Sequence, residues 1–441
     1  MNARFKSDSA YLLAYFAALI AGGAAALSLP AAMPPGSGGL PPIDALFTAT
    51  SAVCVTGLVT VDTTAFTRFG QTVILLLIQL GGLGIISFTS MLLLLPGRQL
   101  PFRRLGTIRS FSLDGVEHDP RRIVAGIVAS TFAIEAAGAL VLYPLFRREG
   151  VAAPGFAAVF HSVSAFCNAG FSTFSDSLAG FRDRPAVLLT VSALIVTGGI
   201  GFIVLQDLAL RLTGKKARLS YHSRLMLVLT AILVAAGALA FWFLEGGNTF
   251  AGMGAPDRAA NALFQSITPR TAGFNAVSQA GLRQPSKLLT MVLMFIGGAP
   301  GSIAGGIKVA TAFLVLLAMI RRPNQWGELN AFKRRYSTAT VNAATSYFIK
   351  AAFLLVAAAA LLSLVEGPRG ADLGQIAFEV TSAFGTVGLS LDFTPSMGTA
   401  GKLVIIATMF IGRVGLLAFV FLGNSTKSGN LVYPEAELLI G

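Results

Sequence analysis

The sequence predicts an all-α membrane protein in which four repeats of outer helix, pore loop and inner helix surround a central pore. Hydrophobic residues make up 54% of the 441 residues and charged residues only 12%, against about 25% charged in soluble domains. A short motif of small and hydroxyl residues, then glycine, then a bulky apolar residue, occurs four times. Its copies are FTATSAVCVTGL (47–58), FHSVSAFCNAGF (160–171), FQSITPRTAGF (264–274) and FEVTSAFGTVGL (378–389).

Composition excludes several other classes of protein. Two cysteines and three histidines are too few for a disulfide framework or a zinc cluster. The net charge is +13, but the basic residues gather between apolar stretches. This pattern is typical of membrane topology rather than of nucleic-acid binding.

Eight stretches are long and apolar enough to cross a bilayer, which takes about 20 residues. The first follows Arg4 and Lys6, as a signal peptide would. Its apolar run is longer than a signal core and no clean cleavage site follows, so a true span is favoured. The eight stretches are 10–29, 70–96, 122–146, 186–212, 223–245, 286–320 (interrupted), 343–365 and 401–423.

Three connecting segments are strongly basic: 97–122, 211–224 and 321–335. With eight spans, these segments fall on the same side of the membrane as both termini. The positive-inside rule makes that side the cytoplasm. We therefore expect both termini to be cytoplasmic and the glycine motifs to face outward.

The motif glycines Gly57, Gly170, Gly273 and Gly388 are 113, 103 and 115 residues apart. A second signature follows them in step. Its copies are GGLG (81–84), GGIG (198–201), GGAP (297–300) and GRVG (412–415), and their first glycines lie 24, 28, 24 and 24 residues beyond the motif glycines. Close helix packing also selects glycine in membranes, but packing alone does not account for two signatures in step. One domain, 1–441, with repeats at about 9–98, 121–215, 222–322 and 343–430, is predicted.

Each motif is preceded by a helix too short to cross a bilayer. Asp44, Asp257 and Asp372 are candidate N-caps, and Pro154 a candidate first residue. Non-helical backbone at membrane depth must line a cavity or be buried in protein. The short helices point their partially negative C-terminal ends inward, which favours a cation at the centre.

The segments that end in the motif glycines are the predicted selectivity filter. Backbone carbonyls can replace the water around a monovalent cation, and glycine permits the tight turn that this arrangement needs. The filter residues are Val55, Thr56, Gly57, Asn168, Ala169, Gly170, Thr271, Ala272, Gly273, Thr386, Val387 and Gly388. The four segments differ, and only TVGL (386–389) approaches the TVGYG run, so imperfect discrimination between potassium and sodium is expected.

The third inner stretch, GGAPGSIAGGIKVAT (297–311), holds five glycines and a proline within ten residues. A kinked, packed helix is one interpretation; a flexible loop that gates the pore below the filter is the other. The candidate gate residues are Gly297, Gly298, Pro300, Gly301, Gly305, Gly306, Lys308 and Arg413.

The two cations among the gate residues each have two interpretations. Lys308 either extends to the cytoplasmic side or acts in the gate. Arg413 lies deep in an apolar stretch, where a charge normally faces a cavity or a partner. It is either a structural pair with a helix or a carbonyl or, as we favour, a positive barrier that lines the pore below the filter.

Other polar residues are expected to have supporting roles. His161 is expected to be hydrogen-bonded within its short helix, and Glu135 to pair with a buried polar group. Four acidic residues are expected to attract cations to the pore mouth only weakly, because salt screens exposed charges. These are Asp62, Asp176, Glu379 and Asp392.

The motifs together resemble those of the Trk/Ktr/HKT superfamily of cation transporters, over nearly the whole chain. The segments that carry the resemblance are TSAVCVTGL, NAGFS, TPRTAGFN, TSAFGTVGLS, GGAPGSIAGGIK, the arginine of GRVG and the C-terminal YPE (433–435). The family's filter glycines then fall on the four motif glycines, its gating loop on about 297–311 and its pore arginine on Arg413. Cys167 departs from the pattern, because a polar residue is often found there.

The resemblance also implies a function and partners. Eight spans without an extra N-terminal pair look more like the Ktr-type membrane subunit than the longer Trk-type one. Gly57, which is serine in sodium-selective plant relatives, implies potassium as the transported ion, with sodium as a candidate activator. Family members form homodimers in the plasma (inner) membrane of prokaryotes and sit on a cytosolic ring of nucleotide-binding regulatory subunits. This sequence contains no such unit, so the regulator would be a separate chain.

Two other functions are kept for comparison. A sodium-conducting or weakly selective monovalent cation channel would use the same filter. An intramembrane enzyme would need paired acids, a Ser/Lys pair or a metal set at membrane depth, and we find none in the sequence. We therefore expect no enzyme activity, no cofactor and no nucleic-acid partner.

Overall fold

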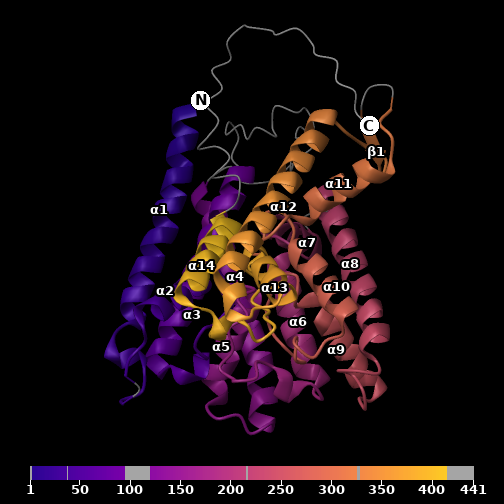
Figure 1. Cartoon of the computed structure of the whole chain (residues 1–441). Helices are drawn as coiled ribbons and strands as arrows, with labels where there is room; N and C mark the ends of the chain where they lie inside the picture. The colour runs from indigo at the N-terminus through magenta and orange to yellow at the C-terminus, as the bar shows by residue number, and fades with distance from the viewer. Residues whose placement is uncertain (1, 37, 95–119, 215–216, 325–327, 415–441) are drawn as a thin grey trace.

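The computed structural model describes residues 2–36, 38–94, 120–214, 217–324 and 328–414, and almost all of their regular secondary structure is helical (Figure 1). Residues 97–119 of the basic segment 97–122 and the YPE motif (433–435) therefore lie outside the described residues. The helices are α1 (Asn2–Leu27), α2 (Pro42–Val53), α3 (Arg68–Leu94), α4 (Pro120–Arg148), α5 (Pro154–Phe166), α6 (Pro185–Gly199), α7 (Phe202–Leu212), α8 (Tyr221–Glu245), α9 (Ala255–Ile267), α10 (Gln284–Phe295), α11 (Val309–Ile320), α12 (Thr338–Glu366), α13 (Leu373–Gly385) and α14 (Thr399–Val414).

Within the described residues, three helices are long and apolar enough to cross a membrane by themselves. They comprise Val124–Arg148, Tyr221–Glu245 and Thr338–Arg369, and the bent pair α6–α7 is a fourth candidate. The described apolar parts of α1, α3 and α11 are shorter. Large apolar side chains such as Phe243, Phe353 and Leu364 are more than 70% exposed, as expected of a surface that faces lipid. The chain is therefore a helical membrane protein.

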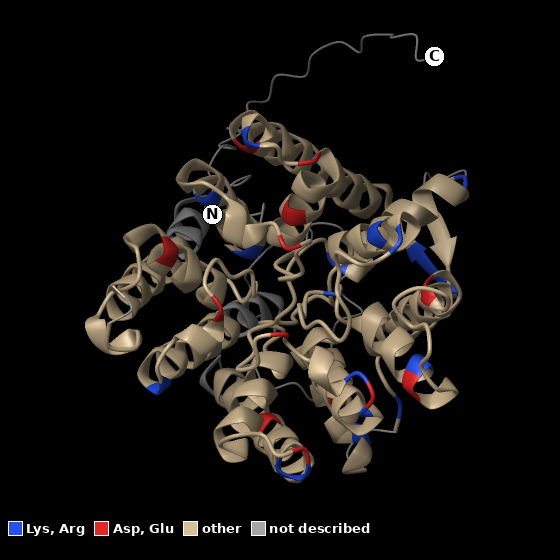
Figure 2. Ribbon diagram, turned by 60° about the horizontal axis from the view of Figure 1, so that its bottom comes forward, with Lys and Arg blue, Asp and Glu red and all other residues tan. Residues whose placement is uncertain are grey.

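Four short helices, α2, α5, α9 and α13, lie inside the protein, and most of their residues are buried. Each packs against the long helix before it: α1, α4, α8 and α12 respectively. We group the helices into four sets, α1–α3, α4–α7, α8–α11 and α12–α14, whose inner helices are α3, α6, α10 and α14. Each short helix also packs against the inner helix of the preceding set, in the pairs α14–α2, α3–α5, α6–α9 and α10–α13. The four pairs close a circle, so the last helix of the chain contacts the first short helix. Figure 2 shows helices around a centre occupied by loops.

A buried ion pair reinforces the closure between the last and first sets. The Lys402 ammonium on α14 lies 2.6 Å from Asp44 on α2, and the two side chains are only 12% and 11% exposed. Two of the predicted caps are wrong, because Asp44 and Asp257 lie inside the first turns of α2 and α9 and not at their N-caps. Prolines at the starts of both helices already set the chain direction. The Asp44 side chain binds Lys402 instead.

The other two predicted helix starts are confirmed. The Asp372 carboxylate accepts a hydrogen bond from the Gly374 amide at 2.8 Å, and Gln375 completes a capping box. Pro154 is the first residue of α5. These local signals are readable in a sequence because both partners lie within one turn of each other.

The predicted span 186–212 is not one straight helix. The axis turns by 106° between α6 and α7, where Gly201 has φ 90° and ψ 145°. That conformation lies outside the helical region and is open to glycine. The interruption predicted within 286–320 is confirmed, because residues 296–308 connect α10 to α11 without helix.

The strands β1 (Leu329–Ala331) and β2 (Arg334–Tyr336), which were not predicted, lie at the end of the basic segment 321–335 and extend one residue beyond it. They form an antiparallel hairpin in which Leu329 pairs with Tyr336. Phe332 and Lys333 turn the chain with positive φ. The hairpin and the amino-terminal end of α1 lie at the same end of the molecule, the upper end in Figure 1.

Candidate functional site

The four glycine turns contact one another in a closed ring. A Cβ added to Gly57 would collide with the Ala169 carbonyl oxygen, and one added to Gly170 would lie 2.8 Å from the Ala272 oxygen. One added to Gly273 would meet the Val387 oxygen, and one added to Gly388 the Thr56 oxygen. Each glycine therefore touches the carbonyl that precedes the glycine of the next set. Only glycine fits at these four positions.

The four turns share a pattern of positive φ angles. Both the motif glycine and the residue two places before it have positive φ; the latter residues are Val55, Asn168, Thr271 and Thr386, with φ of 56°, 57°, 73° and 49°. Positive φ is costly for residues other than glycine. The same strained pattern at four places indicates that the surrounding protein imposes it.

Amide groups of the turns bond backwards to the short helices. The Thr56, Ala169 and Val387 amides donate to the carbonyls of Ser51, Ser164 and Ser382 at 2.7–2.9 Å, and the Ala272 amide donates to the Thr268 carbonyl at 3.0 Å. Side-chain hydroxyls add further bonds. Ser51 and Ser382 accept from Gly57 and Gly388, whereas Ser164 and Thr268 donate to the Phe171 and Phe274 carbonyls.

The carbonyls that precede the glycines have no such partners. Within the described part of the chain, no hydrogen bond ends on the carbonyl oxygens of Thr56, Ala169, Ala272 or Val387. The buried hydroxyls of Thr56, Thr271 and Thr386 also lack a partner there. Buried carbonyls are normally paired, so this ring can accept hydrogen bonds from water or coordinate a cation.

The second glycine signature has a packing explanation. A Cβ on Gly81, Gly198 or Gly412 would collide with the carbonyl oxygen of Val53, Phe166 or Phe384, respectively. Each of these three residues lies four places before its motif glycine. The inner helix thus packs against the start of its own glycine turn, which accounts for a glycine 24 or 28 residues beyond the motif glycine in these three sets. In the third set, a Cβ on Gly297 would meet the Gly305 carbonyl of the same loop instead.

The loop 296–308 folds back on itself beside the ring. Gly297 donates to the Ile307 carbonyl at 2.8 Å and Val309 to the Gly298 carbonyl at 3.1 Å. Gly305 leaves space for the Thr386 side chain, since a Cβ there would collide with the hydroxyl oxygen. The six predicted gate residues from Gly297 to Gly306 are brought together here, next to the fourth turn.

Three cationic side chains bind carbonyls of this loop. Arg413 donates to the Ile303 carbonyl and, at 3.3 Å, to the Gly81 carbonyl. Lys308 donates to the Ala304 carbonyl at 2.5 Å, so it turns into the loop instead of extending away. Arg270 donates to the Gly297 carbonyl at 3.5 Å. Both arginines are over 90% buried, and Arg413 binds one carbonyl of the loop, that of Ile303, and one of α3, that of Gly81.

The supporting residues divide into confirmed and wrong predictions. His161 is hydrogen-bonded at both ring nitrogens, to the Ala157 carbonyl and the Ser172 hydroxyl. Glu135 accepts from the Gln79 amide at 3.0 Å, and the Cys167 sulfur lies 3.7 Å from its other oxygen. Glu379 is fully buried and accepts hydrogen bonds from Ser390 and Thr394, so its prediction as one of the exposed charges is wrong.

Sequence reasoning missed three glutamates that hold the inner helices. Glu149 pairs with Arg184, Glu245 accepts from the Arg283 amide at 2.9 Å, and Glu366 accepts from the Gly398 amide at 3.0 Å. Each lies at the end of an outer helix, beside the start of the inner helix of its set, where a negative charge is favourable. The signal was present, since each glutamate is followed by glycine at 150, 246 and 367.

The Arg184 pair is the most exposed of these contacts. Its guanidinium lies 2.6 Å from Glu149, and this hydrogen bond, together with the carboxylate charge, raises the pKa of Arg184. Exposed pairs of this kind contribute little to stability. The pair therefore orients the start of α6 rather than holding the fold.

A model of the family described as "TrkH: Cation transport protein" matches residues 2–431. The chain belongs to this family. The TrkH family and the relatives below are transporters, so the intramembrane enzyme is set aside.

Curated relatives and a solved structure agree with that assignment. "Ktr system potassium uptake protein B" of Bacillus subtilis is 39% identical over 407 residues, 90% of this chain and 89% of that protein. "Potassium/sodium uptake protein NtpJ" of Enterococcus hirae is 38% identical, with 90% of each chain covered. The crystal structure of the potassium transporter TrkH from Vibrio parahaemolyticus has the same fold, with a TM-score of 0.74 at 20% identity, and covers 96% of this chain and 85% of that one.

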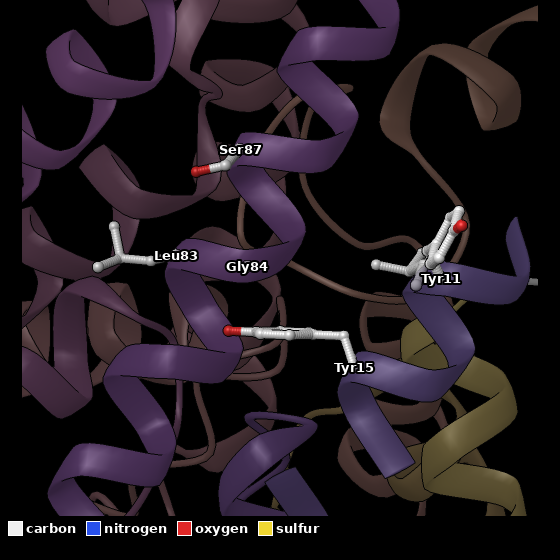
Figure 3. A pocket seen from close by; sticks show the side chains of 6 residues that line it. Tyr11, Tyr15, Leu83, Gly84 and Ser87 are labelled. Carbon is white, nitrogen blue, oxygen red and sulfur yellow. The ribbon is translucent and has the colours of Figure 1, made fainter. Parts of the chain in front are cut away.

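A groove of about 370 Å³ lies away from the ring, between α1 and α3. It is lined by Tyr11, Leu12, Tyr15, Leu83, Gly84 and Ser87. Figure 3 shows the Tyr15 ring extending from α1 toward α3, where its hydroxyl donates to the Leu80 carbonyl at 3.0 Å. The groove is mainly apolar and contains none of the ring or loop residues.

Gly81→Ala tests the packing account of the second signature. The added methyl would lie 2.8 Å from the Val53 carbonyl carbon, and such overpacking costs about 1–3 kcal/mol. We expect a lower melting temperature in detergent. Gly22→Ala in α1 is the matched control, because nothing lies within 4 Å of its added methyl. Equal melting temperatures for the two variants would contradict this account.

Proposed function

We propose that the chain takes up potassium ions through the ring of four glycine turns. The observation that carries this proposal is the set of four unpaired carbonyls, one before each motif glycine, in contact around a closed circle. Carbonyl oxygens arranged in this way can replace the hydration shell of a monovalent cation. The "potassium uptake" in the names of its relatives supports potassium as the ion.

The membrane arrangement belongs to the same proposal. Eight transmembrane segments in four outer helix–pore loop–inner helix repeats would place both termini and the basic segments in the cytoplasm. The membrane would be the plasma (inner) membrane of a prokaryote. The circular contacts among the four sets of helices support the repeats, and the position of the basic hairpin 329–336 at the same end of the molecule as the start of α1 supports a shared side.

The loop 297–311 and Arg413 would form the gate below the filter. The support is direct contact: Arg413 binds the Ile303 carbonyl, and Gly305 packs against Thr386 of the fourth turn. A buried guanidinium beside the loop would repel a cation that leaves the ring. Lys308 would add to that barrier, since its ammonium binds within the loop.

The partners that we propose follow from the family. The chain would form a homodimer in which each copy has its own pore, and a separate cytosolic ring of nucleotide-binding subunits would control the gate. Relatives named for the "Ktr system" support an assembly of several components. No cofactor is required in this chain, and sodium would act as an activator.

A second candidate function is a sodium-conducting or weakly selective channel. The name of the relative from Enterococcus hirae includes both ions. The four turns also differ in sequence, with Val55, Asn168, Thr271 and Thr386 at equivalent positions. Flux of potassium, rubidium and sodium into proteoliposomes separates the two functions; potassium uptake that exceeds sodium uptake supports the first.

Gly57→Ser tests the filter. A side chain at φ 90° would collide with the Ala169 carbonyl and displace it from the ring. We expect the potassium-to-sodium permeability ratio to fall roughly tenfold, which corresponds to about 1.4 kcal/mol. Gly36→Ser is the matched control, because Gly36 has φ 88° with nothing within 4 Å. An unchanged ratio in Gly57→Ser would remove Gly57 from the filter.

Arg413→Ala tests the gate. Loss of the buried charge and of its bond to the Ile303 carbonyl is expected to raise flux roughly tenfold, given the strength of hydrogen bonds to charged groups. Arg413→Lys retains the charge, so it separates a charge barrier from loop anchoring. If Arg413→Ala leaves flux unchanged, the arginine has a structural role instead.

A further inference from the structure

The break between α6 and α7 binds the loop of the third set. A helix end leaves carbonyls without internal donors, and here loop amides supply them. Ala299 donates to the Gly199 carbonyl at 2.9 Å, and Ile303 donates to the Gly198 carbonyl at 3.4 Å. In the other direction, the Phe202 amide donates to the Gly301 carbonyl at 3.0 Å. Three main-chain bonds thus join segments about a hundred residues apart.

These bonds exist only while the helix is bent. In a continuous α-helix, each amide bonds to the carbonyl four residues earlier. The Phe202 amide would then bond to the Gly198 carbonyl, and the Ile203 amide to the Gly199 carbonyl. A straight helix therefore uses the same groups that now hold the loop. The bent and straight forms exclude each other, which gives the segment two discrete states.

We propose that residues 198–202 are a latch that holds the gating loop under the ring while α6 and α7 are bent, and releases it when α7 aligns with α6. This inference rests on the proposed function, since it concerns the gate of that pore. Gly201 is the hinge, because its φ of 90° is required only in the bent form. A Cβ there would also lie 2.8 Å from the Pro300 carbonyl oxygen.

The helix α7 connects the latch to the protein surface. Its first residues, Phe202, Ile203 and Val204, are buried, whereas Leu212 at its other end is 87% exposed. A rigid helix of eleven residues transmits a displacement at this tip to the Phe202 amide. The loop itself is buried from Ala299 to Ile307 except at Pro300, so α7 offers a route by which a signal from outside the membrane reaches it.

Gly201→Ala tests the latch, with Gly214→Ala as the matched control. Gly201 precedes α7 and Gly214 follows it, and both have positive φ. Nothing lies within 4 Å of a Cβ at Gly214, which contacts no loop residue. Alanine at 201 strains the bent form and favours the straight one. We expect rubidium flux of the purified chain in proteoliposomes to rise roughly fivefold for Gly201→Ala and to stay unchanged for Gly214→Ala.

A distance measurement reports the bend independently of flux. Spin labels can be attached to cysteines introduced at Leu189 and Leu212, because both positions are exposed. The native Cys54 and Cys167 are buried and so are protected from the label. A straight helix separates these positions by about 35 Å, and the bent form brings them closer. We expect Gly201→Ala to populate the longer distance and Gly214→Ala to retain the shorter one. Gly199→Ala, whose methyl meets nothing closer than 3.6 Å, acts in the same direction with less strain.

The outcomes separate this inference from the proposed function. A longer distance without a rise in flux would overturn the latch, as would an unchanged distance and flux in both glycine variants at 199 and 201. A wild-type chain that carries no rubidium or potassium would instead overturn the proposed function. In that case the distance measurement still decides whether Gly201 is the hinge between two forms of the helix.

Discussion

Four chain reversals must meet at one depth with their carbonyls unpaired, and the other features of the structure serve that constraint. The amides of each turn bond back to a short helix, which leaves the carbonyls of Thr56, Ala169, Ala272 and Val387 free. The glycines remove the side chains that would separate neighbouring turns. Strain in the turns is tolerated because buried hydroxyl groups such as those of Ser51 and Ser382 fix their geometry.

The third set of helices differs from the other three in the residues just before its glycine turn. The residue three places before the motif glycine is Cys54, Cys167 or Gly385 in those sets, but Arg270 in the third. Gly297 of the third set packs against the Gly305 carbonyl of its own loop. The equivalent glycines of the other sets pack against the carbonyl four residues before the motif glycine. A nearly four-fold arrangement is thereby broken on one side, where the loop, Arg270 and Arg413 lie together.

Much of the site was readable in the sequence because its requirements are local. A turn with positive φ needs glycine at a fixed position, so Gly57, Gly170, Gly273 and Gly388 stand out, and the capping box at Asp372 involves residues one turn apart. The bend at Gly201 was missed because its partners are amides of Ala299 and Ile303, far along the chain. The hydropathy of 186–212 fits a straight span equally well. Asp44 was taken for a cap because its partner, Lys402, lies 358 residues away.

The most direct test is the position of a heavy potassium analogue within the protein. The account predicts that crystals of the wild-type chain grown in rubidium or thallium give an anomalous peak on the axis of the ring, with the carbonyl oxygens of Thr56, Ala169, Ala272 and Val387 around it. Gly57→Ser should weaken that peak. A chain that transports rubidium but shows peaks only elsewhere, with none at the ring, would contradict the account.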